Sequence, residues 1–150
     1  MDIFEEKLDT LLTDTYNSIS KFEEKTLRES GINATISEVH LIEVVGKQQQ
    51  STISSLARNL GITMASVTIA VNKLSDRGFI IKEKNPGDKR SVHLSLTKQG
   101  LRVYRLHRYF HRLMVREVVA GLKSAEKEII YKTVERLNNF FKKSSSGSEK

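Results

Sequence analysis

The residues best suited to chemistry in this chain gather around one short turn, Asn85-Pro86-Gly87. An apolar run precedes the turn and an alternating segment follows it, so residues 79–97 are expected to form a β-hairpin. The tip carries three cations around one carboxylate: Lys84, Asp88, Lys89 and Arg90. A cationic tip suits a polyanion, and a carboxylate is tolerated there if it orients a neighbouring arginine. The alternative is a solvated turn that happens to be charged.

A second candidate surface lies on the helix expected to follow Thr63. Its apolar residues fall on one side, at Val67, Ala70, Val71 and Leu74. The remaining surface carries Ser66, Thr68, Ile69, Asn72 and Lys73. Small side chains permit close approach to the major groove of DNA, hydroxyls and amides match base edges, and an isoleucine matches a thymine methyl. An ordinary solvent-exposed face usually carries more Glu and Lys, so this pattern favours a DNA contact.

The charge distribution also favours a polyanionic partner. Residues 82–112 hold nine lysines and arginines against two acidic residues, which equals the net charge of +7 for the whole chain. Residues 1–29 are acidic by comparison. A concentrated positive charge beside a balanced remainder is typical of proteins that bind nucleic acid, although a charge run alone is more often a solvated helix face.

The composition argues against an enzyme. The chain has no cysteine, no glycine-rich phosphate loop and no Gly-x-Ser-x-Gly elbow. Its acidic N-terminus resembles no signal peptide, and no apolar run approaches the ~20 residues that span a membrane. A soluble cytoplasmic protein is therefore expected, and a protein-interaction module without DNA remains the non-enzymatic alternative.

Caps and glycines set the boundaries of six expected helices around the hairpin. The helices run from the N-terminus to Gly31, from Thr35 to Gly46, from Ser51 or Thr52 to Gly61, from Thr63 to Gly78, from Thr97 to about Gly121, and from Ser124 to about residue 143. The expected fold is therefore mainly α with a small β-hairpin. Length and the lack of a linker indicate a single compact protomer.

The two ends of the chain carry amphipathic helices. The apolar row of the first is Phe4, Leu8, Leu11, Ile19 and Phe22, and that of the last is Ile130, Val134, Leu137 and Phe141. These rows either pack on each other within one protomer or pair with a second chain, and we favour the homodimer. The expected organisation is a DNA-binding domain at 35–97, a helical dimerisation region at 1–34 and 98–143, and a disordered tail at 144–150.

Two motifs resemble the MarR family of bacterial regulators. Asp88-x-Arg90 followed by Leu94-x-Leu96-Thr97-x-x-Gly100 is similar to that family's hairpin, or wing. Thr68-x-x-Val71-x-x-Leu74-x-x-x-Gly78-Phe79-Ile80 resembles its recognition helix and the start of the following strand. The resemblance implies a winged helix-turn-helix dimer, probing a pseudo-palindromic DNA site. It also implies that Arg90 enters the minor groove while Asp88 steadies it, and that Ser66, Thr68, Asn72 and Lys73 contact bases or phosphates.

Two further segments, His40–Lys47 and Arg105–Val115, resemble MarR-type repressors of fatty-acid-synthesis genes. That resemblance implies a corepressor, a long-chain acyl group on acyl carrier protein. Acyl carrier proteins are acidic, so the arginines of the fifth helix suit such a partner. The implied effector residues are His40, Arg105, Leu106, His107, Arg108, Phe110, His111 and Met114. For each apolar member, ordinary core packing is the alternative.

The histidines raise zinc as a rival ligand. His107 and His111 are four residues apart and share one helix face. His40 lies on another expected helix, and Glu23 or Glu24 can complete the set, which we write as Glu24, His40, His107 and His111. The alternative is structural: histidines that hydrogen-bond across helices. A histidine pair fixes too few of the four ligands usual for zinc, so the expectation is no cofactor, with zinc as the alternative.

Overall fold

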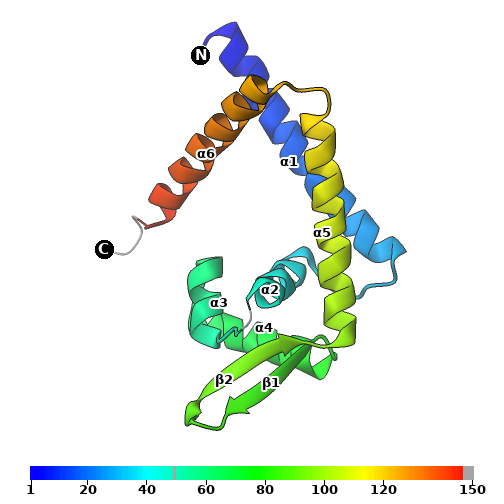
Figure 1. Ribbon diagram of the computed structural model, residues 1–150, viewed down its shortest axis with the longest axis vertical. Coiled ribbons are helices and arrows are strands. Elements are labelled where there is room, and N and C mark those ends of the chain that lie inside the picture. Colours follow the sequence, from blue (N-terminus) through cyan, green and yellow to red (C-terminus); the bar gives the residue numbers. More distant parts are fainter. Residues whose placement is uncertain (49, 147–150) are drawn as a thin grey trace. The chain divides into compact units, whose positions relative to one another are not determined.

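The computed structural model describes residues 1–48 and 50–146, with side chains except at 89, 90, 145 and 146. The elements are α1 (Ile3–Glu29), α2 (Ile36–Lys47), α3 (Ile53–Leu60), α4 (Met64–Asp76), β1 (Ile80–Asn85), β2 (Asp88–Leu96), α5 (Lys98–Val119) and α6 (Ser124–Ser146) (Figure 1). The expected mainly α fold with one hairpin is confirmed. The chain forms two compact units, Met1–His107 and the segment from Arg108 onward.

Threonine caps begin the short helices of the first unit. Thr35 and Glu38 form a reciprocal capping box at the start of α2. Thr52 caps α3 and Thr63 caps α4, each accepting a hydrogen bond from the backbone three residues on. These side chains satisfy backbone N–H groups that a helix start leaves unpaired, so the predicted starts are confirmed. Gly61 ends α3 in the left-handed region, with φ of 65°, which turns the chain directly into α4.

The core of the first unit lies where α2, α3 and α4 meet the base of the hairpin. Its fully buried side chains include Val39, Ile42, Leu56, Val67, Val71, Leu74 and Leu94. Each such side chain stabilises the fold by roughly 1.5–3 kcal/mol relative to exposure. The apolar row expected on α4 therefore does face inward. This unit is larger than the expected domain at 35–97, because α1 and α5 add Leu27 and Val103 to the same core.

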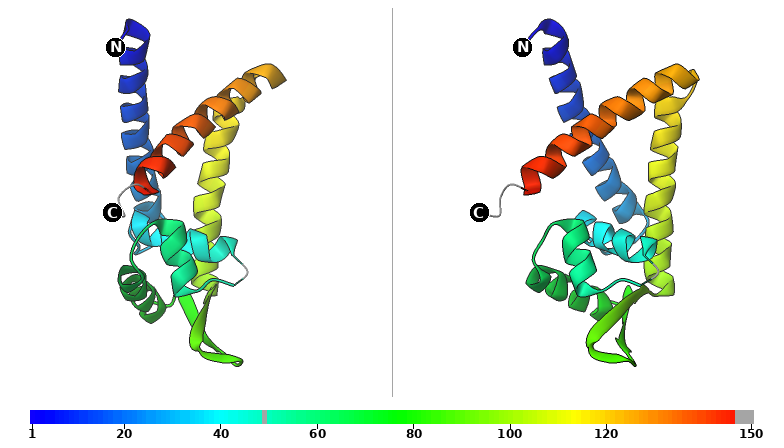
Figure 2. Two further views of the ribbon diagram at one scale, coloured as in Figure 1. Left: turned by 90° about the vertical axis from the view of Figure 1, so that its left-hand side faces the viewer. Right: turned by 60° about the vertical axis from the view of Figure 1, so that its left-hand side comes forward.

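The hairpin is a two-stranded antiparallel sheet whose base is anchored and whose tip projects (Figure 2). Ile80 lies opposite Leu96 at the base, and Asn85 lies opposite Asp88 beside the turn. The backbone N–H of Leu94 donates to the carbonyl of Ser51 at 2.8 Å, which ties β2 to the segment before α3. Ser51 is thus buried in this pairing, and Thr52 rather than Ser51 is the helix cap.

The start of α5 is locked to the hairpin base. The hydroxyl of Thr97 donates to the carbonyl of Gly78 at 2.6 Å and accepts from the N–H of Gly100 at 3.0 Å. A Cβ at Gly100 would lie 2.2 Å from the carbonyl oxygen of Phe79, so only glycine permits this approach.

In the second unit, α6 differs from expectation at both ends. The N–H of Lys123 donates to the Glu126 carboxylate at 2.7 Å, so Lys123 occupies the cap position assigned to Ser124, which is the first helical residue. The helix then continues past the expected end near residue 143, and the hydroxyl of Ser144 donates to the carbonyl of Phe140 within it. Residues 147–150 of the expected tail lie outside the described part.

Among the described helices, none combines the length and apolar character needed to cross a membrane.

Candidate nucleic-acid interface

The outer face of α4 is the first part of the candidate interface. Because Val67, Val71 and Leu74 are fully buried, the opposite side of the helix faces solvent. All five residues predicted there are exposed: Ser66, Thr68, Ile69, Asn72 and Lys73. Ile69 remains 57% exposed although it is apolar, and Met64 in the first turn is 55% exposed. Sequence reasoning missed Met64, although its place one helical turn before Thr68 could have indicated it.

Three polar side chains on this face, those of Ser66, Thr68 and Asn72, take part in hydrogen bonds within the protein. The hydroxyl of Thr63 donates to the hydroxyl oxygen of Ser66 at 2.9 Å. The hydroxyl of Thr68 donates to the carbonyl of Met64 at 2.8 Å. The ammonium of Lys82, on β1, donates to the amide oxygen of Asn72 at 2.8 Å. The face is therefore held in fixed orientations, and Lys82 belongs to it although the sequence did not single it out.

The hairpin tip is the second part. Lys84 and Asp88 are exposed on either side of the turn. Gly87 donates its N–H to the side-chain oxygen of Asn85 at 3.0 Å, which shapes the turn. The backbone of Lys89 and Arg90 lies in β2, while the side chains of both are outside the described part. Their predicted contacts with DNA therefore stay predictions.

The recognition face and the hairpin are rigidly joined within the first unit. The N–H of Phe79 donates to the carbonyl of Leu74 at 2.8 Å, directly linking the end of α4 to the strand. Arg77 forms an ion pair with Glu38 of α2 at 2.8 Å and lies 5.4 Å from the centre of the Phe79 ring. An exposed helix of short polar residues fits the major groove, and a basic hairpin fixed beside it is suited to the neighbouring backbone or groove.

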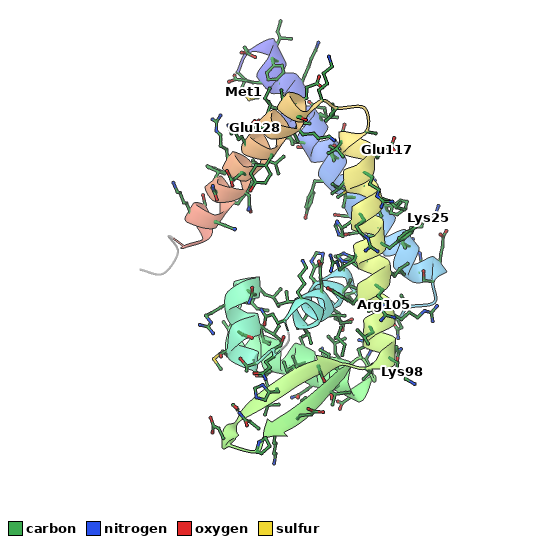
Figure 3. The ribbon with its side chains drawn as sticks, viewed as in Figure 1. Met1, Lys25, Lys98, Arg105, Glu117 and Glu128 are labelled. Carbon is green, nitrogen blue, oxygen red and sulfur yellow. The ribbon has the colours of Figure 1, made fainter. Side chains whose placement is uncertain are left out.

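The effector residues predicted in the first unit lie in different surroundings. His40 and Arg105 are exposed, Leu106 is half-buried and His107 is buried. Lys98 and Arg105 mark the first half of α5, where the arginines begin (Figure 3). The remaining predicted members lie on α5 in the second unit, where Arg108 is exposed and Phe110, His111 and Met114 are half-buried. The predicted effector set therefore divides between the two units.

His107 lies between two carboxylates. Its Nε2 is 3.1 Å from Glu23 on α1, and its Nδ1 is 3.1 Å from Glu43 on α2. The ring of His40 meets the His107 ring edge-on, with centroids 5.5 Å apart. The hydrogen bond of Nε2 with Glu23 and the close contact of Nδ1 with Glu43 tie α5 to α1 and α2. This is the cross-helix structural role that the sequence left open.

The carboxylate at His107 is Glu23 and not Glu24. Glu23 is 6% exposed, whereas Glu24 faces outward and lines an open hollow beside Thr35. One helical position separates the two side chains by about 100°, so only one of them can face inward. A zinc ion held by both His107 Nε2 and Glu23 would take the place of the proton between them, and two zinc ligands about 3.3 Å apart are close to the 3.1 Å separation of these atoms.

A solvent-facing helix of short polar residues, fixed beside a basic hairpin, defines a DNA-binding regulator of the winged helix-turn-helix class. The sequence model of the MarR family matches residues 34–92. Streptococcus pneumoniae FabT, solved in complex with DNA, is 33% identical over 93% of this chain and 98% of that chain, with a TM-score of 0.85. The chain belongs to the MarR family, which confirms the resemblance seen in the sequence.

Curated relatives from Bacillus subtilis agree. The HTH-type transcriptional regulator MhqR is 23% identical over 133 residues, which are 87% of this chain and 89% of MhqR. An uncharacterised HTH-type transcriptional regulator, YhjH, is 28% identical over 98 residues, so this chain spans only 56% of YhjH. The regulator SlyA, at 18% identity and a TM-score of 0.67, shares the fold.

Proposed function

We propose that this protein is a homodimeric repressor of fatty-acid-synthesis genes, with long-chain acyl-acyl carrier protein as corepressor. The observation that carries the proposal is the match to FabT in complex with DNA, since it extends over 98% of that chain. The face of α4 and the hairpin tip supply the expected surfaces for a pseudo-palindromic operator. Beyond DNA binding, the proposal therefore specifies the regulated genes, those of fatty-acid synthesis, and the effector, acyl-acyl carrier protein.

Exposed apolar rows support the homodimer. On α1, Phe4 is 71% exposed, Leu11 63% and Phe22 50%. On α6, Val134 and Phe141 are both 58% exposed. Apolar rows of this length are costly to leave in water, and a second copy offers the same rows to cover them. A two-fold dimer then presents two recognition faces to two half-sites.

The exposed arginines of α5 support an acidic protein partner. They are Arg102, Arg105, Arg108, Arg112 and Arg116. Cations spread along one helix attract an acidic protein over long range and raise its association rate. The half-buried apolar residues Leu106, Phe110 and Met114 suit contact with an acyl chain. Together they provide a charged surface for the carrier and an apolar one for its cargo.

Zinc is the second candidate effector, and the contact between Glu23 and His107 at 3.1 Å is the observation that favours it. The ligands would come from Glu23, His40, His107 and His111. Zinc binding would release protons and replace the present carboxylate contacts of His107.

An operator-binding titration separates these proposals. Fragments from fatty-acid-synthesis promoters are titrated at fixed salt with long-chain acyl-acyl carrier protein, with the unacylated carrier, with zinc, or with a chelator. The acylated carrier should tighten binding at least tenfold while the unacylated carrier does not. Tightening by zinc alone, reversed by the chelator, would replace the acyl proposal with the metal one.

Arg90→Ala tests the hairpin in the same titration. Loss of a groove-inserted arginine should weaken operator binding roughly tenfold and leave the oligomeric state unchanged. Unchanged affinity at the same salt concentration would remove the hairpin from the interface.

A further inference from the structure

We propose that Lys82 of β1 determines base specificity by holding Asn72 of α4 so that the amide NH₂ faces the DNA. The inference rests on the α4 face entering the major groove and goes beyond that function by assigning a hydrogen-bond polarity to it. Its basis is the contact of Lys82 Nζ with Asn72 Oδ1 at 2.8 Å.

The contact fixes which end of the amide points outward. A lysine ammonium only donates, so the atom of Asn72 that faces it must be the carbonyl oxygen. The NH₂ group then points away from Lys82, and among the described residues no group accepts from it. Both side chains are exposed, so the amide of Asn72 is open to a DNA base. Without Lys82, either end of Asn72 could face a base.

The hydroxyl groups of Thr68 and Ser66 also have defined donor and acceptor roles, which their internal hydrogen bonds set. The Thr68 hydroxyl donates its hydrogen to the carbonyl of Met64, so towards the DNA the hydroxyl oxygen can only accept a hydrogen bond. Ser66 accepts the proton of Thr63, which leaves its own proton to donate. Ile69, 57% exposed between these groups and Asn72, offers only an apolar contact. The face therefore presents donor, acceptor, apolar and donor groups in the order Ser66, Thr68, Ile69 and Asn72.

This order specifies which base edges the face accepts. The Asn72 NH₂ requires an acceptor, such as N7 of a purine, O6 of guanine or O4 of thymine. The Thr68 oxygen requires a donor, which adenine N6 or cytosine N4 supplies. Ile69 suits a thymine methyl. An asparagine free to rotate accepts both classes of edge, so Lys82 converts a permissive contact into a selective one.

The test compares base preferences rather than affinity alone. The full-length protein selects binding sites from a randomised DNA pool, and Asn72→Ala identifies the position in each half-site that Asn72 contacts. Lys82→Met should reduce the preference at that same position about fivefold, since one good base contact discriminates by roughly tenfold. Lys82→Arg keeps a donor and should retain the preference. Far-ultraviolet circular dichroism checks that each variant is folded.

Lys84→Met is the matched control. It removes the same charge two residues along the same strand, without contact to Asn72 among the described residues. It should weaken binding to all sequences and flatten the salt dependence, while the base preferences stay as in the wild type. If Lys82→Met behaves the same way, Lys82 contacts only phosphate and the inference is overturned.

Asn72→Asp tests whether the hydrogen-bond preference at this position can be reversed from donor to acceptor. The substitution replaces the NH₂ donor with an oxygen, so the preferred base at the mapped position should change to one that offers a donor, or the preference should vanish. Retention of the wild-type preference would contradict the inference. If the wild-type protein selects no sequence at all, the DNA-binding function itself fails, which is a separate outcome.

Discussion

His107 is a buried histidine at the junction of α1, α2 and α5. Its side chain is 4% exposed and has a carboxylate at each ring nitrogen, from Glu23 and Glu43. A buried ion pair of this kind need not add net stability, because removing charges from water costs several kcal/mol. Loss of one partner is nevertheless expensive, since it leaves a charge without compensation. The arrangement therefore makes the junction of α1, α2 and α5 sensitive to single substitutions.

Glu23→Gln and Glu24→Gln form the first paired prediction. Glu23→Gln keeps the shape of the side chain but removes one counter-charge of His107, so the free energy of unfolding should fall by about 2 kcal/mol. Glu24→Gln alters an exposed carboxylate and should change it by less than about 0.5 kcal/mol. Urea unfolding at one fixed protein concentration measures both. Equal effects would mean that Glu23 does not support His107.

Glu23 and Lys82 show which contacts could be predicted from the sequence and which could not. Glu23 lies in the row Ile19, Glu23 and Leu27, whose members are four positions apart, and Leu27 is buried. That spacing places Glu23 inward and was the available signal against Glu24. The contact of Lys82 with Asn72 left no such signal, because it joins a strand to a helix through side chains whose separation depends on tertiary packing.

At the scale of elements, the hairpin base and the start of α5 are joined through Thr97, whose N–H donates to the carbonyl of Phe79 and whose hydroxyl donates to that of Gly78. The caps at Thr35, Thr52, Thr63 and Thr97 followed from local chemistry and were predictable. The pairing of Ser51 with Leu94 was not, because its partners lie 43 positions apart in the printed numbering. At the start of α6, a glutamate side chain bonded to Lys123 left Ser124 to begin the helix. Local signals thus placed the elements, and long-range packing determined how they are joined.

Gly100→Ala tests the junction of hairpin and α5. The added Cβ would lie 2.2 Å from the carbonyl oxygen of Phe79, a backbone atom that cannot rotate away. We expect the free energy of unfolding to fall by at least about 2 kcal/mol. Gly87→Ala is the control, because its Cβ would lie 3.6 Å from the side chain of Asn85, an ordinary contact. A wild-type melting temperature for Gly100→Ala would show that α5 can shift on the hairpin without cost.

At the scale of the whole molecule, charge and apolar surface have separate tasks. The positive charge is concentrated between residues 82 and 112, where we propose that a polyanion binds, whereas α1 and α6 leave large apolar side chains in solvent. The sequence could not decide what covers these apolar side chains, because the same amphipathic rows suit packing within one chain or between two chains. We propose the second arrangement, in which a second copy covers these rows. DNA affinity should then depend on assembly as well as on the recognition face.

Val134→Glu tests this dependence. Val134 is 58% exposed in the protomer, so a glutamate there should leave the fold intact but place a charge inside a dimer interface. We expect a monomer in sedimentation velocity at micromolar concentration, and operator binding weakened about a hundredfold because the half-sites are no longer engaged together. Arg136→Gln changes the net charge by the same amount on the opposite side of α6, and it should remain dimeric. A dimeric Val134→Glu with wild-type operator affinity would exclude this stretch of α6 from the interface.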